Sequence, residues 1–206
     1  MATTTTTRRT TKRDRSILPF LIAALAVVVL VVLAIVFFGG SDANNGAPAA
    51  GANGTSNSAG ALLNKALAEM NSGNLAQAKT DLEQVSRIDP QNKYAYYNLG
   101  YIAQTQGSKA DAESQYKLAL AIDAKYDPAL YNFAILRADA HDTNGAIVLY
   151  RQAIASNPKD ASAHFNLGLL LRQTGNAAEG NTEVQAAVTI RPSLKQSARE
   201  QGVPVN

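Results

Sequence analysis

The strongest constraint on this chain of 206 residues is a spacing of 34 residues, at which the same residue types return in four successive stretches. The stretches start at residues 59, 93, 127 and 161. Counting slots from each start, the recurring residues are Asn64, Asn98, Asn132 and Asn166 at slot 6, Ala66, Gly100, Ala134 and Gly168 at slot 8, and Ala78, Ala112, Ala146 and Gly180 at slot 20. Each stretch holds two apolar-periodic segments of about a dozen residues, which predict two helices. A fixed period of this length marks a solenoid whose units bury their apolar faces by stacking, and this architecture favours binding over catalysis.

The small residues at slots 8 and 20 indicate where the two helices of one unit approach closely. A larger side chain at Gly100 or Ala112 is expected to push these helices apart, at a cost of about 1–3 kcal/mol. The connecting turns read NSGN, TQGS and QTGN, at residues 71–74, 105–108 and 173–176. Glycine in such a turn permits the left-handed conformation that ends a helix. The third unit has His141 in this slot, and we expect a distorted turn there.

The second stretch resembles the tetratricopeptide repeat family most fully. The residues that carry the resemblance are Tyr96, Leu99, Gly100, Gly107, Ala112, Tyr116 and Ala119. The third and fourth stretches repeat YNFA and FNLG in the same register. The resemblance implies an all-α fold, a right-handed α-solenoid of four helix hairpins with a C-terminal capping helix. The predicted units are residues 59–92, 93–126, 127–160 and 161–192, and the capping helix and tail are residues 193–206. Lys65, Ala124 and His141 depart from the family pattern.

Ahead of the repeats, residues 17–38 are uncharged and mostly apolar, and as a helix they would be about 33 Å long, enough to span a bilayer. A basic tail at residues 1–16, predicted to be disordered, precedes them, and the next basic residue is Lys65. The positive-inside rule therefore predicts a single-pass plasma (inner) membrane protein of bacterial type, with a cytoplasmic N-terminus and extracytoplasmic repeats. Residues 39–58, rich in glycine, alanine, asparagine and serine, are predicted to be a flexible linker. A cleaved signal peptide is the alternative, but its apolar region is usually only about 7–15 residues long.

Composition argues against several classes of function. The chain has no cysteine, which excludes disulfides and thiolate metal sites. The net charge of +3 arises in the basic tail and the remainder is nearly balanced, so we expect no nucleic-acid partner. The two histidines, His141 and His164, lie in a turn and at a packing slot, and neither is accompanied by the nucleophile that a catalytic set needs. We therefore predict that the protein is not an enzyme and binds no metal or cofactor.

In the tetratricopeptide family the first helix of each unit lines a concave face, and the resemblance implies a peptide-binding groove there. The implied groove residues are Tyr97, Asn98, Tyr101, Tyr131, Asn132, Ile135, Phe165, Asn166 and Leu169. An asparagine side chain offers a donor and an acceptor to the main chain of an extended peptide, and aromatic side chains supply apolar area with few rotors to immobilise. The alternative is that these residues serve only the packing of helices.

We predict a membrane-anchored module whose groove holds another protein or an extended peptide, as a scaffold, assembly factor or chaperone-like accessory. A clamp for acidic C-terminal tails is not expected, because slots 2 and 6 carry no lysine or arginine. Two alternatives remain open at this point. One is a self-associating structural element of a membrane or cell-envelope complex, which would be a homo-oligomer, and the other is a non-catalytic subunit of an enzyme complex.

Overall fold

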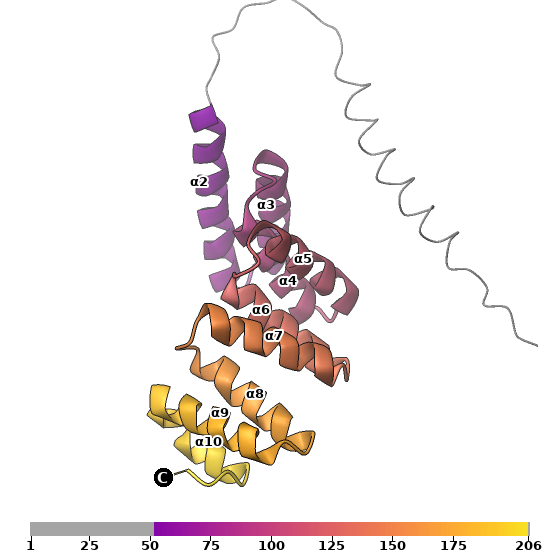
Figure 1. Ribbon diagram of the computed structural model, residues 1–206. Helices are drawn as coiled ribbons and strands as arrows, with labels where there is room; N and C mark the ends of the chain where they lie inside the picture. The colour runs from indigo at the N-terminus through magenta and orange to yellow at the C-terminus, as the bar shows by residue number, and fades with distance from the viewer. Residues whose placement is uncertain (1–51, 206) are drawn as a thin grey trace, which may run out of the picture. The chain divides into compact units, whose positions relative to one another are not determined.

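The computed structural model describes residues 52–205, which belong to one compact unit built of helices (Figure 1). In chain order the elements are α2 (Ala52–Asn71), α3 (Leu75–Ile88), α4 (Lys93–Thr105), α5 (Lys109–Ile122), α6 (Asp127–Asp139), α7 (Thr143–Ser156), α8 (Ala161–Gln173), α9 (Ala177–Ile190), the 3₁₀ turn η1 (Pro192–Leu194) and α10 (Lys195–Glu200). Over this range no strand is present, and the predicted all-α solenoid of hairpins is confirmed. The helices α4, α6 and α8 begin at the first residues of the predicted second, third and fourth units.

The first helix starts earlier than composition predicts. Helix α2 begins at Ala52, so the end of the predicted linker, residues 52–58, is helical. The prediction was wrong there because a residue added to an existing helix gains a backbone hydrogen bond without the cost of helix nucleation. The low helix propensity of glycine, asparagine and serine opposes this extension only weakly. The predicted basic tail, the apolar segment 17–38 and the rest of the linker lie outside the described residues. Among residues 52–205, no helix is both long and apolar enough to cross a membrane.

The two helices of each hairpin meet through the small residues of slots 8 and 20. A Cβ atom built on Gly168 would lie 2.6 Å from the carbonyl oxygen of Gly180 and 2.6 Å from Cγ2 of Val184. A Cβ atom on Gly100 would lie 2.7 Å from the ring of Tyr116. These separations are well below van der Waals contact, so the predicted close approach of the paired helices is confirmed.

The turns inside the four hairpins share one geometry. The second residue after each first helix has a positive φ, which is 81° at Gly73, 79° at Gly107, 60° at His141 and 91° at Gly175. Around His141, its own N–H donates to the carbonyl of Ala138 and the next N–H donates to that of Arg137, both at 2.9 Å. This is the Schellman pattern, and the glycine turns repeat it. The distortion expected at His141 is therefore absent, since the backbone reproduces the glycine turn despite the side chain.

Consecutive hairpins stack by packing the second helix of one on the first helix of the next, α3 on α4, α5 on α6 and α7 on α8 (Figure 1). Tyr116 of α5 is fully buried at such a junction, with its ring near the rings of Tyr97 and Phe133. Its hydroxyl donates to the side-chain oxygen of Gln104 at 2.6 Å. The buried phenol thus keeps a hydrogen-bond partner, and burial raises its pKa.

In the first hairpin, an ion pair replaces the apolar contact that the family pattern would make. Lys65, at a slot where leucine is usual, places its Nζ atom 2.7 Å from Oδ2 of Asp81 in α3. Asp81 is only 4% exposed, and Gln77 donates to its other carboxylate oxygen at 3.0 Å. The hydrogen bond from Lys65 is the main cause that lowers the pKa of Asp81. The carboxylate is therefore buried as a paired anion.

The stack is closed at its C-terminal end by α10 and the segment after it, as the capping prediction requires. Ala198, Val203 and Val205 are buried in one cluster with Val184 and Val188 of α9. Gly202, with φ of 68°, ends α10 and turns the chain back. The outward face of this end is polar and exposed, as expected for the last element of a repeat array.

Candidate functional site

Two neighbouring clefts lie on the first helices of the repeats. The first, which we call the tyrosine cleft, encloses about 470 Å³ between α4, α6 and the loop before α8. Its lining residues are Tyr97, Tyr101, Asp127, Pro128, Tyr131, Asn132, Asn157, Lys159, Asp160, Ser162 and Arg191. Four of the predicted groove residues are therefore brought together in one place. Of these, Tyr101 is the most accessible, with 42% of its surface exposed.

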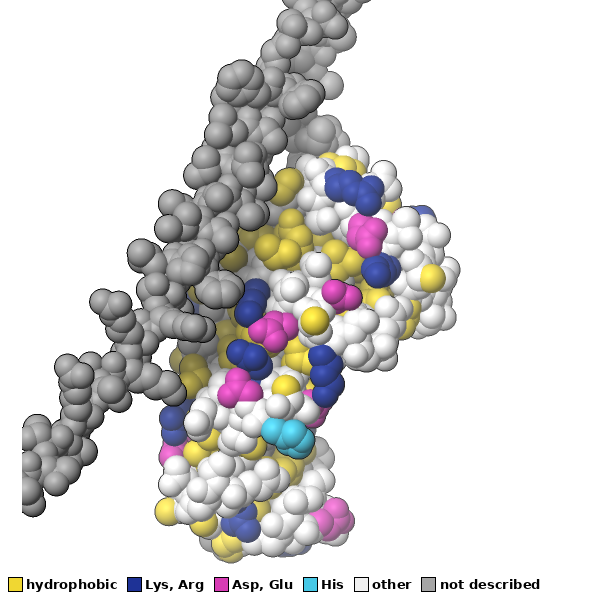
Figure 2. All heavy atoms as spheres, turned by 90° about the vertical axis from the view of Figure 1, so that its right-hand side faces the viewer, with side chains coloured by type: hydrophobic (Ala, Val, Ile, Leu, Met, Phe, Trp, Pro, Cys, Tyr) yellow, Lys and Arg dark blue, Asp and Glu magenta, His cyan; other side chains and the backbone are white. Residues whose placement is uncertain are grey.

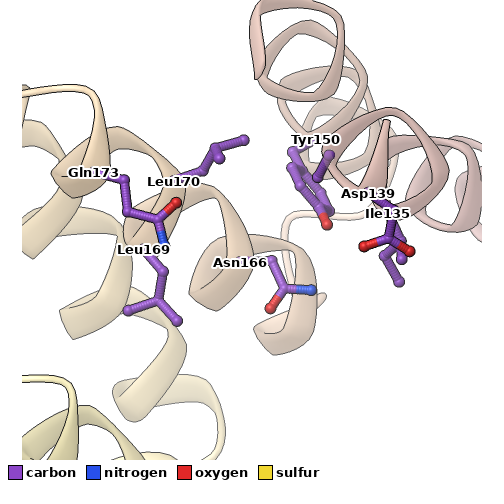
Figure 3. Close-up of a pocket in the computed structure, with 8 residues that line it drawn as sticks. Ile135, Asp139, Tyr150, Asn166, Leu169, Leu170 and Gln173 are labelled. Carbon is purple, nitrogen blue, oxygen red and sulfur yellow. The ribbon is translucent and has the colours of Figure 1, made fainter. Parts of the chain in front are cut away.

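The second, which we call the amide cleft, encloses about 320 Å³ and is shown in Figure 3. It is lined by Ile135, Ala138, Asp139, Tyr150, Asn166, Leu169, Leu170 and Gln173. In Figure 3 the α8 residues Asn166, Leu169 and Gln173 lie opposite Ile135, Asp139 and Tyr150 from α6 and α7. Three more predicted groove residues, Ile135, Asn166 and Leu169, are thus gathered here.

The asparagines of the two clefts already hold neighbouring repeats together. The amide of Asn132 donates to the hydroxyl of Tyr97 at 3.0 Å, and that of Asn166 donates to the hydroxyl of Tyr131 at 3.1 Å. In both cases slot 6 of one unit meets slot 5 of the preceding unit. We call these two contacts the Tyr–Asn ties. Each amide has two N–H bonds and a carbonyl acceptor, so one bond to tyrosine leaves capacity for a ligand.

Asn98 differs from the other two asparagines for a reason visible in the repeat. Its slot-5 neighbour in the first unit is Leu63, which has no hydroxyl to accept a bond. Asn98 instead donates to the carbonyl of Tyr94 in its own helix at 2.7 Å and is only 7% exposed. It therefore lies beneath the surface, whereas Asn132 and Asn166 line the clefts.

Phe165 is also separated from the two clefts. It packs, with Leu169, against the buried cluster of Val184, Val188 and the C-terminal segment. Leu169 thus belongs both to the amide cleft and to this cluster. The predicted groove residues of the fourth repeat are partly covered by the chain itself.

The tyrosine cleft has a mixed electrostatic character. Asp127 and Asp160 contribute carboxylates, and Lys159 and Arg191 contribute cations. Burial raises the pKa of Tyr131, and the negative charge of Asp160 adds to this effect. The Tyr131 hydroxyl is therefore a neutral donor and acceptor at physiological pH. On the face that Figure 2 displays, lysine and arginine side chains are interspersed with aspartate and glutamate side chains.

Several lining residues were absent from the sequence prediction. Asp139 and Gln173 share slot 13, which points into the groove in the family, so the repeat register alone could have indicated them. Arg191 could not have been found in this way, because it follows the last unit's second helix and reaches the tyrosine cleft only through the fold. Its guanidinium donates to the hydroxyl of Ser162 at 3.1 Å.

The histidines make contacts that serve the structure. The imidazole Nδ1 of His164 lies 2.6 Å from a carboxylate oxygen of Glu183 in α9, and its Nε2 lies 3.2 Å from the carbonyl oxygen of Pro158. His141 is exposed in its turn. Within residues 52–205, no group of three or more histidine, aspartate or glutamate side chains is placed to hold a metal ion.

The fold and its clefts define a helical-hairpin solenoid with two clefts lined partly by tyrosine and asparagine side chains. A family model described as "Tetratricopeptide repeat" matches residues 63–127, and another described as "TPR repeat" matches residues 141–175. Together with the four stacked hairpins, these matches show that residues 63–127 and 141–175 are tetratricopeptide repeats. A search of curated proteins finds no match.

Solved structures share this fold at low sequence identity. A structure concerned with Pseudomonas aeruginosa pilF has a TM-score of 0.65 at 23% identity, with 72% of this chain and 68% of that one aligned. MamA from Desulfovibrio magneticus has a TM-score of 0.62 at 19% identity, over 70% of this chain and 81% of that one. A mutant of Thermobaculum terrenum O-GlcNAc transferase has a TM-score of 0.60 at 20% identity, but only 26% of that chain is aligned, with 66% of this one. At such identities the likeness shows the fold alone.

Proposed function

We propose that the concave face binds an extended segment of a partner protein and that the protein acts as a scaffold or assembly factor without catalytic activity of its own. The observation that carries this proposal is the pair of neighbouring clefts, which share helix α6 and are lined by seven of the nine groove residues expected from the sequence. Tetratricopeptide repeats serve as protein-interaction scaffolds, which supports the same function.

The chemistry of the clefts suits a polypeptide main chain. Asn132 retains an N–H bond and a carbonyl acceptor beyond its Tyr–Asn tie. Asn166 also hydrogen-bonds to Tyr150, and it retains one hydrogen-bonding group beyond these two contacts. Tyr101 and Ile135 offer apolar surface beside these amides, one in each cleft. An extended segment, which rises about 3.3 Å per residue, can run from one cleft into the other along α6. Its main chain would bond to the amides and its side chains would contact the tyrosine ring and the isoleucine.

We further propose that residues 17–38 anchor the protein in the plasma membrane, with the repeats outside the cytoplasm. The support for this step comes from the sequence: an uncharged segment long enough to span a bilayer, preceded by a cluster of basic residues. An anchored scaffold of this kind would hold its partner close to the membrane.

Site-specific photocrosslinking in living cells tests the proposed binding face. A photoreactive phenylalanine derivative would replace Tyr101 in the tyrosine cleft and, separately, Ile135 in the amide cleft. Val148 is the matched control, because it is an apolar residue on the second helix of its hairpin and is 53% exposed. We expect both cleft positions to yield the same crosslinked protein and the control to yield none. Identical products from all three positions would contradict a groove-specific partner.

A further inference from the structure

The segment that follows α10 is bound to the last hairpin in the manner of a peptide. Helix α10 ends in a Schellman turn, in which the N–H of Val203 donates to the carbonyl of Ala198 at 3.0 Å and that of Gly202 donates to Arg199 at 2.9 Å. Beyond the turn, Val203 and Val205 are 3% and 9% exposed, whereas Pro204 between them faces solvent. Burial of every second side chain is the pattern of an extended chain lying on a surface.

The surface beneath this segment comes from α8 and α9. Val184 and Val188 form its buried floor, and Phe165 and Leu169 pack at its side. We call these four residues the apolar shelf. The register of the repeat explains why the shelf exists: a fifth unit would begin at residue 195, but α10 has six residues against thirteen in α4, α6 and α8. The short helix leaves apolar surface that the valines then cover.

Arg172 adds main-chain recognition to the shelf. Its guanidinium Nη2 donates to the carbonyl oxygen of Gly202 at 3.1 Å and to that of Gln201 at 3.4 Å. The same side chain donates from Nη1 to Asn181 of α9, which fixes its direction. Contacts to successive carbonyls depend on backbone position and not on side-chain identity. The shelf and Arg172 therefore have the two components of an extended-peptide site.

We propose that the shelf is a binding site for an extended, uncharged segment with two branched apolar side chains two residues apart, and that residues 201–205 occupy it as an exchangeable internal ligand. A partner segment of this Val-X-Val type displaces the internal one and lies against the same surface. This proposal deepens the proposed function and rests on it, because Leu169 joins the shelf to the amide cleft. A partner that fills the amide cleft and continues past Leu169 meets the internal segment directly.

The test uses a fluorescent peptide with the sequence of residues 201–206 and the full chain in mild detergent. An internal ligand lowers the apparent affinity for the added peptide to the intrinsic affinity multiplied by the fraction of time that the site is free. The double substitution Val203→Asp with Val205→Asp releases the internal segment, and Pro204→Asp, at an exposed position, is the matched control. We expect the double variant to bind the peptide at least about tenfold more tightly than the natural chain and the control variant.

Two further variants keep the outcome decisive. A chain that ends at Gly202 lacks both valines and the Val203 N–H bond to Ala198 but keeps the bond from Gly202 to Arg199. It replaces the double variant if circular dichroism shows that the latter has lost helix. Adding Arg172→Met to either released chain should weaken peptide binding at least about tenfold.

A second copy of the chain as occupant would appear as a dimer that the peptide dissociates, and this result also supports the site. Equal peptide binding by the natural and released chains, or none by folded released chains, would overturn the proposal. Because crosslinking from Tyr101 and Ile135 does not involve the valines, the proposed function can stand when this inference fails.

Discussion

Replacing Gly168 with alanine should destabilise the fold, although the same change stabilises most helices. The new Cβ atom would lie 2.6 Å from the carbonyl oxygen of Gly180, 2.6 Å from Cγ2 of Val184 and 2.9 Å from the Val184 nitrogen. Two of these three atoms belong to the backbone of α9, so relief requires the paired helices to separate. Overpacking of this kind costs about 1–3 kcal/mol, whereas alanine gains up to about 1 kcal/mol over glycine in a helix interior. The packing cost therefore dominates.

Gly60 provides the matched control for this prediction. It lies in α2, and a Cβ atom there would meet no atom within 4 Å. We expect Gly60→Ala to stabilise the protein by about 0.5–1 kcal/mol, from helix propensity alone. The two variants carry the same chemical change and are predicted to move stability in opposite directions.

Thermal unfolding followed by far-ultraviolet circular dichroism measures both variants. For a folded part of this size, 1 kcal/mol corresponds to a shift of about 2–4 °C in Tm. A net loss of about 1–2 kcal/mol in Gly168→Ala should lower Tm by about 2–8 °C, and Gly60→Ala should raise it by a smaller amount. If Gly168→Ala unfolds at or above the natural Tm, the close approach of α8 and α9 is not what fixes glycine at this slot.

Three other predictions concern single contacts. His141→Gly should stabilise by about 0.5–1 kcal/mol in urea unfolding, because a non-glycine residue held at φ of 60° is strained; a lower midpoint would show that the imidazole compensates. Tyr131→Phe should lower the free energy of unfolding by about 0.5–1.5 kcal/mol, because it removes the acceptor for Asn166. This loss should be smaller in an Asn166→Ala background. An equal loss in both backgrounds would show that the hydrogen bond contributes nothing to stability. Asp81→Asn should lower stability at neutral pH. Because the pKa of Asp81 is lower when folded than its ordinary value of 3.8, its contribution is present above that value and is lost as the pH falls through the folded pKa. The two stabilities should thus converge in acid, and a constant difference would exclude the ion pair with Lys65.

The repeat period predicted the elements that depend on local sequence. Helix starts at Lys93, Asp127 and Ala161 coincide with the starts of the predicted units. The glycines that recur between the paired helices correctly predicted the left-handed turns there. These features recur because each unit makes the same contacts within about thirty residues. One period and one set of small residues therefore suffice to indicate the hairpin and its neighbour.

Contacts that occur only once in the chain could not be predicted from the repeat pattern. The ion pair of Lys65 with Asp81 accommodates a lysine that departs from the repeat pattern in the first unit only. The repeat pattern therefore could not predict this pair. Arg172 is a second case, because it bonds to the carbonyls of Gln201 and Gly202. That role depends on the chain reversing after α10, a non-periodic event that the repeat register does not encode.

Because of the Tyr–Asn ties, mutation of the predicted groove asparagines does not by itself test whether they bind a ligand. Asn132 lines the tyrosine cleft and also bonds to Tyr97 in the preceding hairpin. Replacing Asn132 with alanine therefore removes a potential ligand contact and a contact between stacked hairpins together. Weaker partner binding by that variant would follow from either loss. Tyr101 and Ile135 line the clefts without belonging to a tie, so alanine at those positions changes the ligand surface while the ties remain. Ile135 also packs against the buried cluster of α6, α7 and α8, so its truncation is expected to lower Tm. A binding defect in Tyr101→Ala, with an unchanged Tm, is therefore the result that assigns the tyrosine cleft to a partner.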